Sequence, residues 1–357
     1  LSRLISRRRP SGTASATELT PSSSPTPTQR LNHNTHILMA ETNQTKYTEA
    51  FGAFAPALTV EELDSRIAKI LEERFEKNNT REVKKFLHST IDLTTLSGTD
   101  TEEKVAQLVA SVNDFEGTED VPSVAAICVY PNFVKTVREV LTAEGVQVAC
   151  VSGCFPASQS FPEVKIAETA LAIAAGADEI DIVLNLGAFL AGDYLEASTE
   201  IEEQKATARG AHLKVILETG ALRDPELIRR ASILALFSGA DFLKTSTGKE
   251  FPGADLRAAY ILCSVLREYR EKYGELRGVK FSGGIRSAEE AVKYYCLVEA
   301  LLGEEWLDNR LFRIGASSLV GSPPAGDPRL SSPILPLISH TGYPCSAPAE
   351  GVACRAM

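Results

Sequence analysis

The chain has 357 residues, of which 44% are hydrophobic and 24% charged, and its formal net charge is −10. This composition is typical of a globular protein with a sizeable core. The negative charge argues against a nucleic-acid scaffold and against a polybasic membrane surface, because both need a basic face. No apolar run reaches the roughly 18 residues of a transmembrane helix. We therefore expect neither nucleic acid nor a membrane as a partner.

The first 38 residues are rich in Arg, Ser, Thr and Pro and contain one acidic residue, Glu18. Such a composition buries too little apolar surface to fold alone. Two interpretations stay open. The segment resembles an organellar transit peptide, or Met39 is the native start and the preceding residues are translated upstream sequence. In both cases we expect residues 1–50 to be a disordered or targeting-like segment.

Residues 59–86 show the apolar periodicity of a helix. Thr59 and Glu62 have the spacing of a capping box, in which each side chain accepts a hydrogen bond from the backbone of the other. We therefore predict an extra helical segment before the first strand.

Eight short apolar runs rich in β-branched residues follow, and from the third onward they recur about every 30–35 residues. They lie at 88–93, 123–130, 146–152, 179–185, 212–219, 242–246, 278–282 and 312–317. Helical stretches separate them, for example at 163–178, 225–241 and 287–303.

Eight strands that alternate with helices predict a parallel sheet closed into a (β/α)8 TIM barrel, which we place at residues 51–320. An open doubly wound sheet is the alternative, but no GxGxxG follows the first strand. Residues 321–357 are rich in Pro, Ser and Gly and lack helical periodicity where the last barrel helix should begin. We expect them to form an atypical loop or disordered tail.

Two lysines, Lys244 and Lys280, stand inside neighbouring apolar strands, at the carboxyl ends where barrels place their active sites. Each alone is compatible with an interior lysine paired to a carboxylate. Together, two ammonium groups repel each other and lower one pKa, which favours a neutral amine that can form an imine with a carbonyl. Asp181 is either a structural ion-pair partner or the acid–base group of that reaction.

The last two strands end in small residues, in SGGIRS (282–287) and IGASSL (314–319). Loops after strands seven and eight of such barrels commonly hold a phosphate, and glycine lets backbone N–H groups approach it. Tight turns are the alternative interpretation, and Lys249 is either a phosphate ligand or a solvated loop lysine. The candidate phosphate-binding residues are Gly283, Gly284, Gly315, Ser317, Ser318 and Lys249. The sequence thus predicts a small phosphorylated carbonyl substrate.

Several segments of the chain resemble the deoxyribose-phosphate aldolase family, and they occur in the same order over about residues 88–320. The matching segments are IDLTTL (91–96), AAICVYPNFV (125–134), GADEIDIVLN (176–185), LKVILETGALRDPELIRRAS (213–232), GADFLKTSTGK (239–249), VKFSGGIRSAEEA (279–291) and FRIGASSL (312–319).

The resemblance implies a class I, metal-independent lyase of deoxyribonucleoside catabolism that reversibly cleaves 2-deoxy-D-ribose 5-phosphate to D-glyceraldehyde 3-phosphate and acetaldehyde. It implies that Lys244 forms the Schiff base and that Lys280 lowers its pKa. By the same resemblance Asp181 transfers protons, Asp92 supports the substrate hydroxyl and the proton relay, and the protein is a homodimer or a higher homo-oligomer.

The cysteines and histidines indicate the cellular compartment and whether the protein binds a metal. The seven cysteines are odd in number and form no CxxC pair, which favours a reducing compartment. The five histidines show no HxH or HxxxH spacing in the core. We therefore expect no metal, no other cofactor and a cytoplasmic location, or an organellar one if residues 1–38 are a transit peptide.

Two segments depart from the family pattern. Cys154 precedes the Phe-Pro pair where the family usually has Gly or Asn, and the chain end at 321–357 lacks the family's last helix and terminal tyrosine. Two alternative functions therefore stay open: a catalytically impaired barrel that binds a phosphosugar, and another Schiff-base aldolase of the transaldolase type. The histidine positions disfavour a class II metal aldolase.

Overall fold

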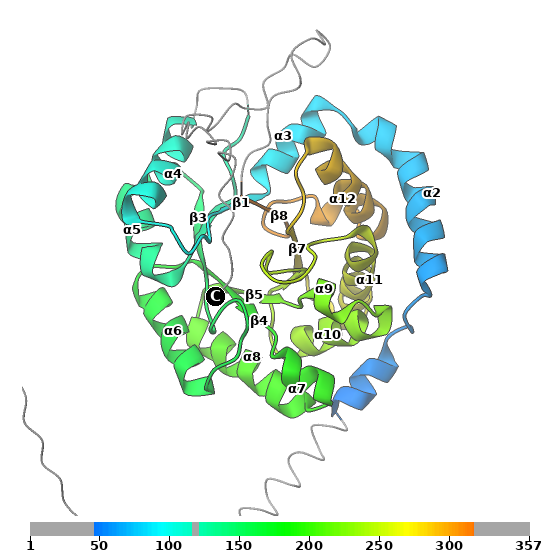
Figure 1. Ribbon diagram of the computed structural model, residues 1–357. Coiled ribbons are helices and arrows are strands. Elements are labelled where there is room, and N and C mark those ends of the chain that lie inside the picture. Colours follow the sequence, from blue (N-terminus) through cyan, green and yellow to red (C-terminus); the bar gives the residue numbers. More distant parts are fainter. Residues whose placement is uncertain (1–45, 116–120, 318–357) are drawn as a thin grey trace, which may run out of the picture. The chain divides into compact units, whose positions relative to one another are not determined.

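A computed structural model describes residues 46–115 and 121–317, which belong to one compact unit. Its eight strands are parallel and close in sequence order into a barrel, because β1 pairs with both β2 and β8. The predicted (β/α)8 barrel is therefore confirmed (Figure 1). The strands are β1 (Ile91–Thr94), β2 (Ala126–Val129), β3 (Gln147–Val151), β4 (Glu179–Val183), β5 (His212–Ile216), β6 (Phe242–Lys244), β7 (Gly278–Ser282) and β8 (Phe312–Ala316).

Helices follow the strands and form a ring around them (Figure 1). They are α4 (Glu102–Phe115), α5 (Val134–Val140), α6 (Pro162–Ala174), α7 (Leu186–Ala191), α8 (Tyr194–Ala208), α9 (Thr219–Leu222), α10 (Pro225–Phe237), α11 (Leu256–Tyr273) and α12 (Ala288–Leu301), with 3-10 turns η1 (Pro131–Phe133) and η2 (Glu304–Trp306). None of the described helices is both long and apolar enough to cross a membrane. The tail predicted at 321–357 lies outside the described residues.

The N-terminal helical segment is present, but it is two helices rather than one. α2 (Val60–Asn78) begins with the predicted capping box: the Thr59 hydroxyl accepts from the Glu62 N–H at 3.2 Å, and the Glu62 carboxylate accepts from the Thr59 N–H at 2.9 Å. The helix ends because the side chain of Thr80 accepts from the Val83 N–H and starts α3 (Arg81–Ser89).

These N-terminal elements pack around the barrel. α2 lies outside α11 and α12 (Figure 1). A further helix at residues 46–53 begins inside the segment 1–50 and buries Tyr47 and Phe51. α3 extends to Ser89, so β1 starts at Ile91 and not at residue 88 as expected.

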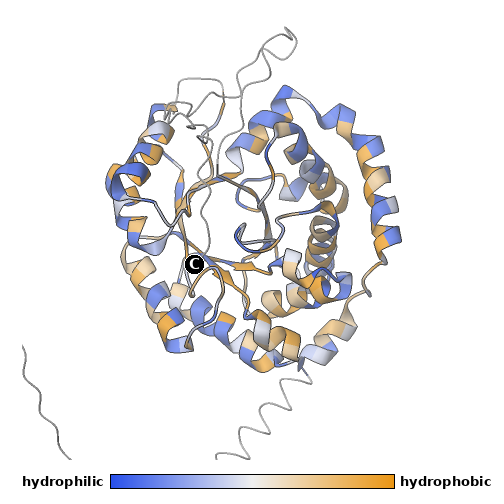
Figure 2. Ribbon diagram, viewed as in Figure 1, coloured by the Kyte–Doolittle hydropathy of each residue, from blue (hydrophilic) through white to orange (hydrophobic). Residues whose placement is uncertain are grey.

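Strand residues alternate between two buried surfaces. In β4, Ile180 and Ile182 join the core between the sheet and the helices, whereas Glu179 and Asp181 face the barrel interior, where their charged partners lie. This alternation follows from the two-residue period of a strand. Figure 2 shows the strands as largely apolar and the outward surfaces of the helices as largely polar. Charged side chains can therefore be interior without interrupting the main core.

Candidate active site

The two predicted lysines are neighbours at the carboxyl ends of β6 and β7. Lys244 and Lys280 are register partners, and their exposed fractions are 3% and 0%. The Nζ atom of each lies 2.8 Å from the same oxygen, Oδ2 of Asp181 on β4. One carboxylate oxygen therefore serves two cations, and the barrel brings three of the predicted site residues into direct contact.

Asp92 joins the same group from β1. Its Oδ2 lies 2.5 Å from the Lys280 Nζ, and its Oδ1 accepts from the Arg313 guanidinium at 2.7 Å. The side chain is fully buried. All four residues predicted for the chemistry thus form one continuous cluster across β1, β4, β6 and β7.

Sequence reasoning missed three charged members of this cluster: Glu179, Lys214 and Arg313. Lys214 on β5 lies 2.9 Å from Asp181 Oδ1 and 2.5 Å from Glu179 Oε2. Two features of the sequence could have indicated Lys214 and Glu179. Lys214 stands in an apolar strand as Lys244 does, and Glu179 lies two residues before Asp181 and so on the same side of β4.

Burial and neighbouring charges shift the pKa values of the cluster residues in different directions. Burial lowers the pKa of Lys244; Asp181 opposes this shift, Lys280 adds to it, and the net direction is downward. Burial also disfavours the charged form of Lys280, but Asp181 and Asp92 together hold the pKa of that lysine well above its usual value. Burial would raise the pKa of Asp181, but its lysine neighbours hold it well below the usual range. Lys244 is therefore the lysine most easily neutralised beside an ionised carboxylate.

The interior opposite the charges is apolar. A separate cluster lines it and consists of Leu96, Ala126, Cys128, Ala149 and Val151, with Tyr130 and Phe155 packed against it. Burial raises the pKa of the Cys128 thiol, so this side chain is neutral. Phe155 belongs to the loop that departs from the family pattern, where Cys154 has a left-handed backbone and its N–H donates to Glu168 at 2.7 Å. These side chains form an apolar part of the barrel interior.

The glycine loops that we predicted to bind phosphate lie next to each other. Gly283 and Gly284 follow β7 with φ of 84° and 87°, which a side chain would strain. Gly315 on β8 is the register partner of Ser282, and a Cβ there would lie 2.6 Å from the Ser282 Cβ. Ser317 follows β8 and is exposed. Close approach of the two backbones therefore requires glycine at 315.

The other two residues that we predicted to bind phosphate are Lys249 and Ser318. Lys249 is exposed, and its Nζ donates to the Leu96 carbonyl in the loop after β1, so it bridges two loops at the end of the barrel where the lysine pair lies. Ser318 lies outside the described residues.

Comparison with known proteins agrees with the site. A family model described as DeoC/LacD family aldolase matches residues 86–300. The chain belongs to this aldolase family. A Caenorhabditis elegans protein, named provisionally as a deoxyribose-phosphate aldolase, is 38% identical over 262 residues, which cover 73% of this chain and 86% of the relative.

Solved structures of aldolases share the fold. The deoxyribose phosphate aldolase of Aeropyrum pernix, described as tetrameric, is 28% identical with a TM-score of 0.53 and covers 73% of this chain and 94% of its own. An aldolase named QR15 is 32% identical, with a TM-score of 0.53 and coverage of 65% and 91%. As an aldolase, the protein is a lyase of a family that acts on small phosphosugars.

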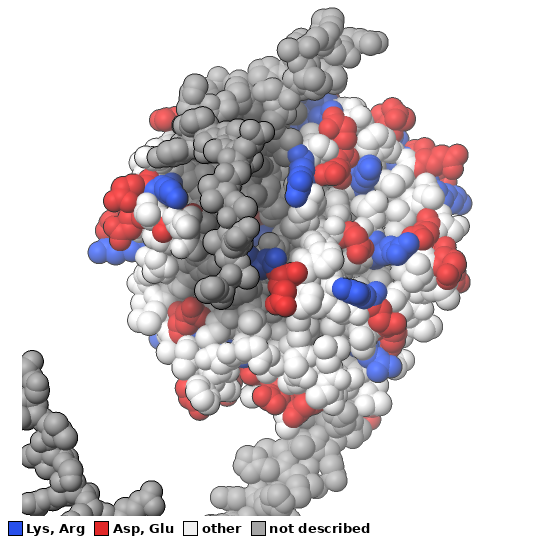
Figure 3. All heavy atoms as spheres, in the orientation of Figure 1, with Lys and Arg blue, Asp and Glu red and all other residues white. Residues whose placement is uncertain are grey.

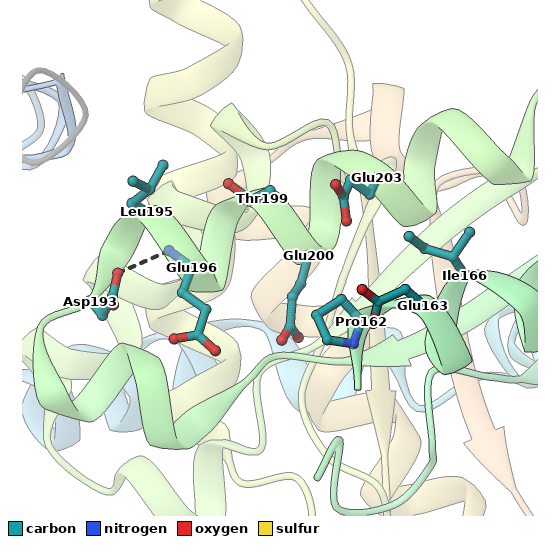
Figure 4. Close-up of a pocket in the computed structure, with 9 residues that line it drawn as sticks. All are labelled: Pro162, Glu163, Ile166, Asp193, Leu195, Glu196, Thr199, Glu200 and Glu203. Carbon is teal, nitrogen blue, oxygen red and sulfur yellow. Dashed lines mark hydrogen bonds between the residues drawn. The ribbon is translucent and has the colours of Figure 1, made fainter. Parts of the chain in front are cut away.

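A hollow of about 430 Å³ lies between α6 and α8 of the aldolase. Figure 4 shows Glu196 and Glu200 pointing from α8 toward the start of α6. The Glu200 carboxylate is held by the Lys165 Nζ at 2.6 Å and by the Asn185 amide at 3.0 Å. Among residues 46–115 and 121–317, no three His, Cys, Asp or Glu side chains are arranged to hold a metal ion.

The outer surface differs from the charged interior. On the described part of the face in Figure 3, acidic and basic side chains are interspersed. The buried cluster around Asp181, by contrast, concentrates charged side chains in the barrel interior.

Proposed function

We propose that this aldolase is a class I deoxyribose-phosphate aldolase. It reversibly cleaves 2-deoxy-D-ribose 5-phosphate to D-glyceraldehyde 3-phosphate and acetaldehyde, and Lys244 forms the imine. The observation that carries the proposal is the buried amine of Lys244, which shares its one carboxylate oxygen with a second lysine. Such a site produces the neutral amine that imine formation requires.

The first half of the reaction forms the imine. The neutral Lys244 amine adds to the C1 aldehyde of the open-chain sugar, and loss of water with uptake of one proton gives an iminium. The positive nitrogen then accepts the electron pair of the C2–C3 bond, and this bond breaks. The C3 hydroxyl loses its proton and becomes the aldehyde of glyceraldehyde 3-phosphate. A two-carbon enamine remains on Lys244.

The second half returns the enzyme to its starting state. C2 of the enamine takes up one proton, and water hydrolyses the resulting iminium to acetaldehyde and the free Lys244 amine, with release of the proton taken up earlier. Asp181 accepts the C3 hydroxyl proton and returns it to C2 through an intervening water. Lys280 stabilises the Asp181 carboxylate and, with Asp92, supports the proton relay, because their side chains are in contact at 2.8 and 2.5 Å.

The phosphate binds in this proposal where the loops after β7 and β8 meet. Two consecutive glycines with positive φ allow the backbone to approach an anion closely. Lys249 contributes charge after release from the Leu96 carbonyl. The proposed ligands are Gly283, Gly284, Gly315, Ser317, Ser318 and Lys249. The reaction needs no cofactor, belongs to deoxyribonucleoside catabolism and is carried out by a homo-oligomer, in keeping with the tetrameric relative.

The test is borohydride trapping with acetaldehyde or deoxyribose 5-phosphate, followed by mass spectrometry of the intact protein and its peptides. We expect an ethyl group on Lys244 after reduction of the acetaldehyde imine and no adduct in Lys244→Met. Lys135→Met is the matched control, since Lys135 is an exposed helix lysine whose ion pair, with Glu139 one turn along α5, is also exposed. A folded wild-type protein without an adduct would contradict the imine and favour a barrel that binds a phosphosugar without cleaving it.

A further inference from the structure

The ion-pair network inside the barrel contains more cations than carboxylates when all its members are ionised. Seven buried ionisable side chains contact one another there: the carboxylates Asp92, Glu179 and Asp181 and the cations Lys214, Lys244, Lys280 and Arg313. Within this network four cations face three carboxylates. The buried Glu218 interacts with Lys244 but makes no ion pair among the described residues, and burial raises its pKa, which favours its neutral form. An uncompensated charge is strongly unfavourable when buried, so the cluster balances when one lysine is neutral.

The contacts distinguish the three lysines. Lys214 touches Glu179 at 2.5 Å and Asp181 at 2.9 Å. Lys280 touches Asp92 at 2.5 Å and Asp181 at 2.8 Å. Among the described residues, Lys244 makes an ion pair only with Asp181, at 2.8 Å, through an oxygen that Lys280 also contacts. Neutralising Lys244 therefore loses less ion pairing than neutralising either of the others.

Glu179 and Arg313 lie near the amino ends of their strands, whereas Lys244 is the last residue of β6. The Arg313 guanidinium donates to Asp92 at 2.7 Å and to Glu179 at 2.8 Å, and both it and Glu179 are buried. Arginine stays protonated, so Arg313 is a fixed cation. Glu179 also pairs with Lys214, which is one of the three lysines in contact with Asp181. Within the described part of the chain, neither residue makes an ion pair with Lys244.

We propose that Glu179 and Arg313 are positioning residues whose opposite charges set the balance of the cluster and leave Lys244, rather than Lys214 or Lys280, as the neutral amine. The inference rests on the proposed imine chemistry of this site and names two residues outside the proposed reacting set. Other titratable groups face Lys244 as well and remain unchanged in the test: Asp92 on β1, Cys128 on β2, Asp181 on β4, Lys214 on β5, Glu218 after β5 and Lys280 on β7.

Variants of opposite charge test the proposal, because they should shift the pH dependence in opposite directions. Glu179→Gln removes a negative charge, disfavours protonated Lys244 and should move the acid limb of imine formation to lower pH by about one unit. Arg313→Gln removes a positive charge and should move it to higher pH by about one unit. The double variant restores the charge balance and should titrate close to wild type. Arg313→Lys keeps the charge and should also keep the profile.

Two readouts separate this inference from the proposed reaction. Borohydride trapping of acetaldehyde against pH reports the imine. Methylation by formaldehyde and cyanoborohydride against pH reports the reactivity of each lysine without any aldolase turnover. In wild type we expect Lys244 to be methylated at lower pH than Lys214 and Lys280.

The outcomes are distinct. Opposite shifts at Lys244, cancelled in the double variant, support the proposal even if deoxyribose 5-phosphate is not cleaved. Two outcomes overturn the proposal: slower labelling of Lys244 with an unchanged pH dependence in folded variants, or methylation of Lys280 at a lower pH than Lys244. Neither outcome decides the aldolase reaction, which borohydride trapping tests separately. If Glu179→Gln does not fold, the contrast between Arg313→Gln and Arg313→Lys decides, because an unchanged profile in both would also overturn the proposal.

Discussion

Lys244 and Lys280 are register partners on neighbouring strands, and their nitrogens meet at one oxygen of Asp181, each at 2.8 Å. Lys280 has a second carboxylate, Asp92, at 2.5 Å, whereas among the described residues Lys244 makes an ion pair with Asp181 alone. The two lysines look alike in sequence, but this difference raises the pKa of one and lowers that of the other. Four predictions follow from this geometry and from its surroundings.

Replacement of Lys280 should move the pH dependence of catalysis. In Lys280→Met the neighbouring ammonium is lost, so the pKa of Lys244 rises and less of the amine is neutral near pH 7. Loss of a proton-relay group adds to the effect, and we expect kcat/KM to fall by about 10²–10⁴-fold. The measurement is kcat/KM for deoxyribose 5-phosphate against pH. An acid limb at the wild-type position would contradict the coupling between the lysines.

A methyl group at position 315 should disturb both packing and catalysis. In Gly315→Ala the new Cβ lies 2.6 Å from the Ser282 Cβ and 3.4 Å from the Lys280 Cε. We expect a loss of ~1–3 kcal/mol in the free energy of unfolding and a lower kcat, because Lys280 is displaced. Gly52→Ala is the control, since no atom lies within 4 Å of its Cβ. Urea unfolding and steady-state kinetics measure both effects, and equal stability of the two variants would contradict the prediction.

The buried pair Lys165–Glu200 should stabilise the loop that carries Phe155. Lys165 Nζ donates to Glu200 at 2.6 Å and to Ser158 in that loop at 3.0 Å. Glu200→Gln leaves a buried ammonium without its carboxylate, and we expect a loss of ~3–5 kcal/mol in the free energy of unfolding.

The double variant Lys165→Met/Glu200→Leu is the matched control for this pair. It removes both charges and should be much closer to wild type in urea unfolding. A double variant as unstable as Glu200→Gln would show that packing, and not the unpaired charge, causes the loss.

Glu226 should make stability depend on acid pH. Hydrogen bonds from Arg229, with Arg230 adding to them, lower the pKa of Glu226 to about 2, and its carboxylate also accepts from the Ala57 N–H. An unfolded-state glutamate titrates near about 4.3. The stabilisation is therefore fully present above about pH 4.3 and is lost as the pH falls through about 2.

Glu226→Gln tests this dependence. After allowance for solvent screening we expect it to reduce the free energy of unfolding by about 1 kcal/mol at pH 7, with the difference from wild type vanishing near pH 2. Glu271→Gln, in an exposed pair with Arg267, should change stability by less than ~0.5 kcal/mol at either pH. A constant difference across the pH range would exclude an ionic origin.

Local sequence patterns predicted much of the fold. The errors lie at element boundaries, where the end of one element and the start of the next compete for the same residues. The capping box at Thr59 is present, but the expected helix over 59–86 divides because Asn79 ends α2 and Thr80 caps α3. The first strand starts three residues late for a related reason: His88 and Ser89 complete the last turn of α3. Element type depends on periodicity over many residues, whereas a boundary depends on one or two competing hydrogen bonds.

The sequence by itself determined the barrel and the presence of two interior lysines with Asp181. Strand period, repeat length and residue type are local properties that can be read directly from the order of the amino acids. Only the tertiary structure decided which charges meet. Arg313 and Asp92 are 221 positions apart, yet their side chains are 2.7 Å apart once β8 pairs with β1. Charge interactions depend on distance in space and on burial, so the single pairing of Lys244 follows from the closure of the barrel and not from any local pattern.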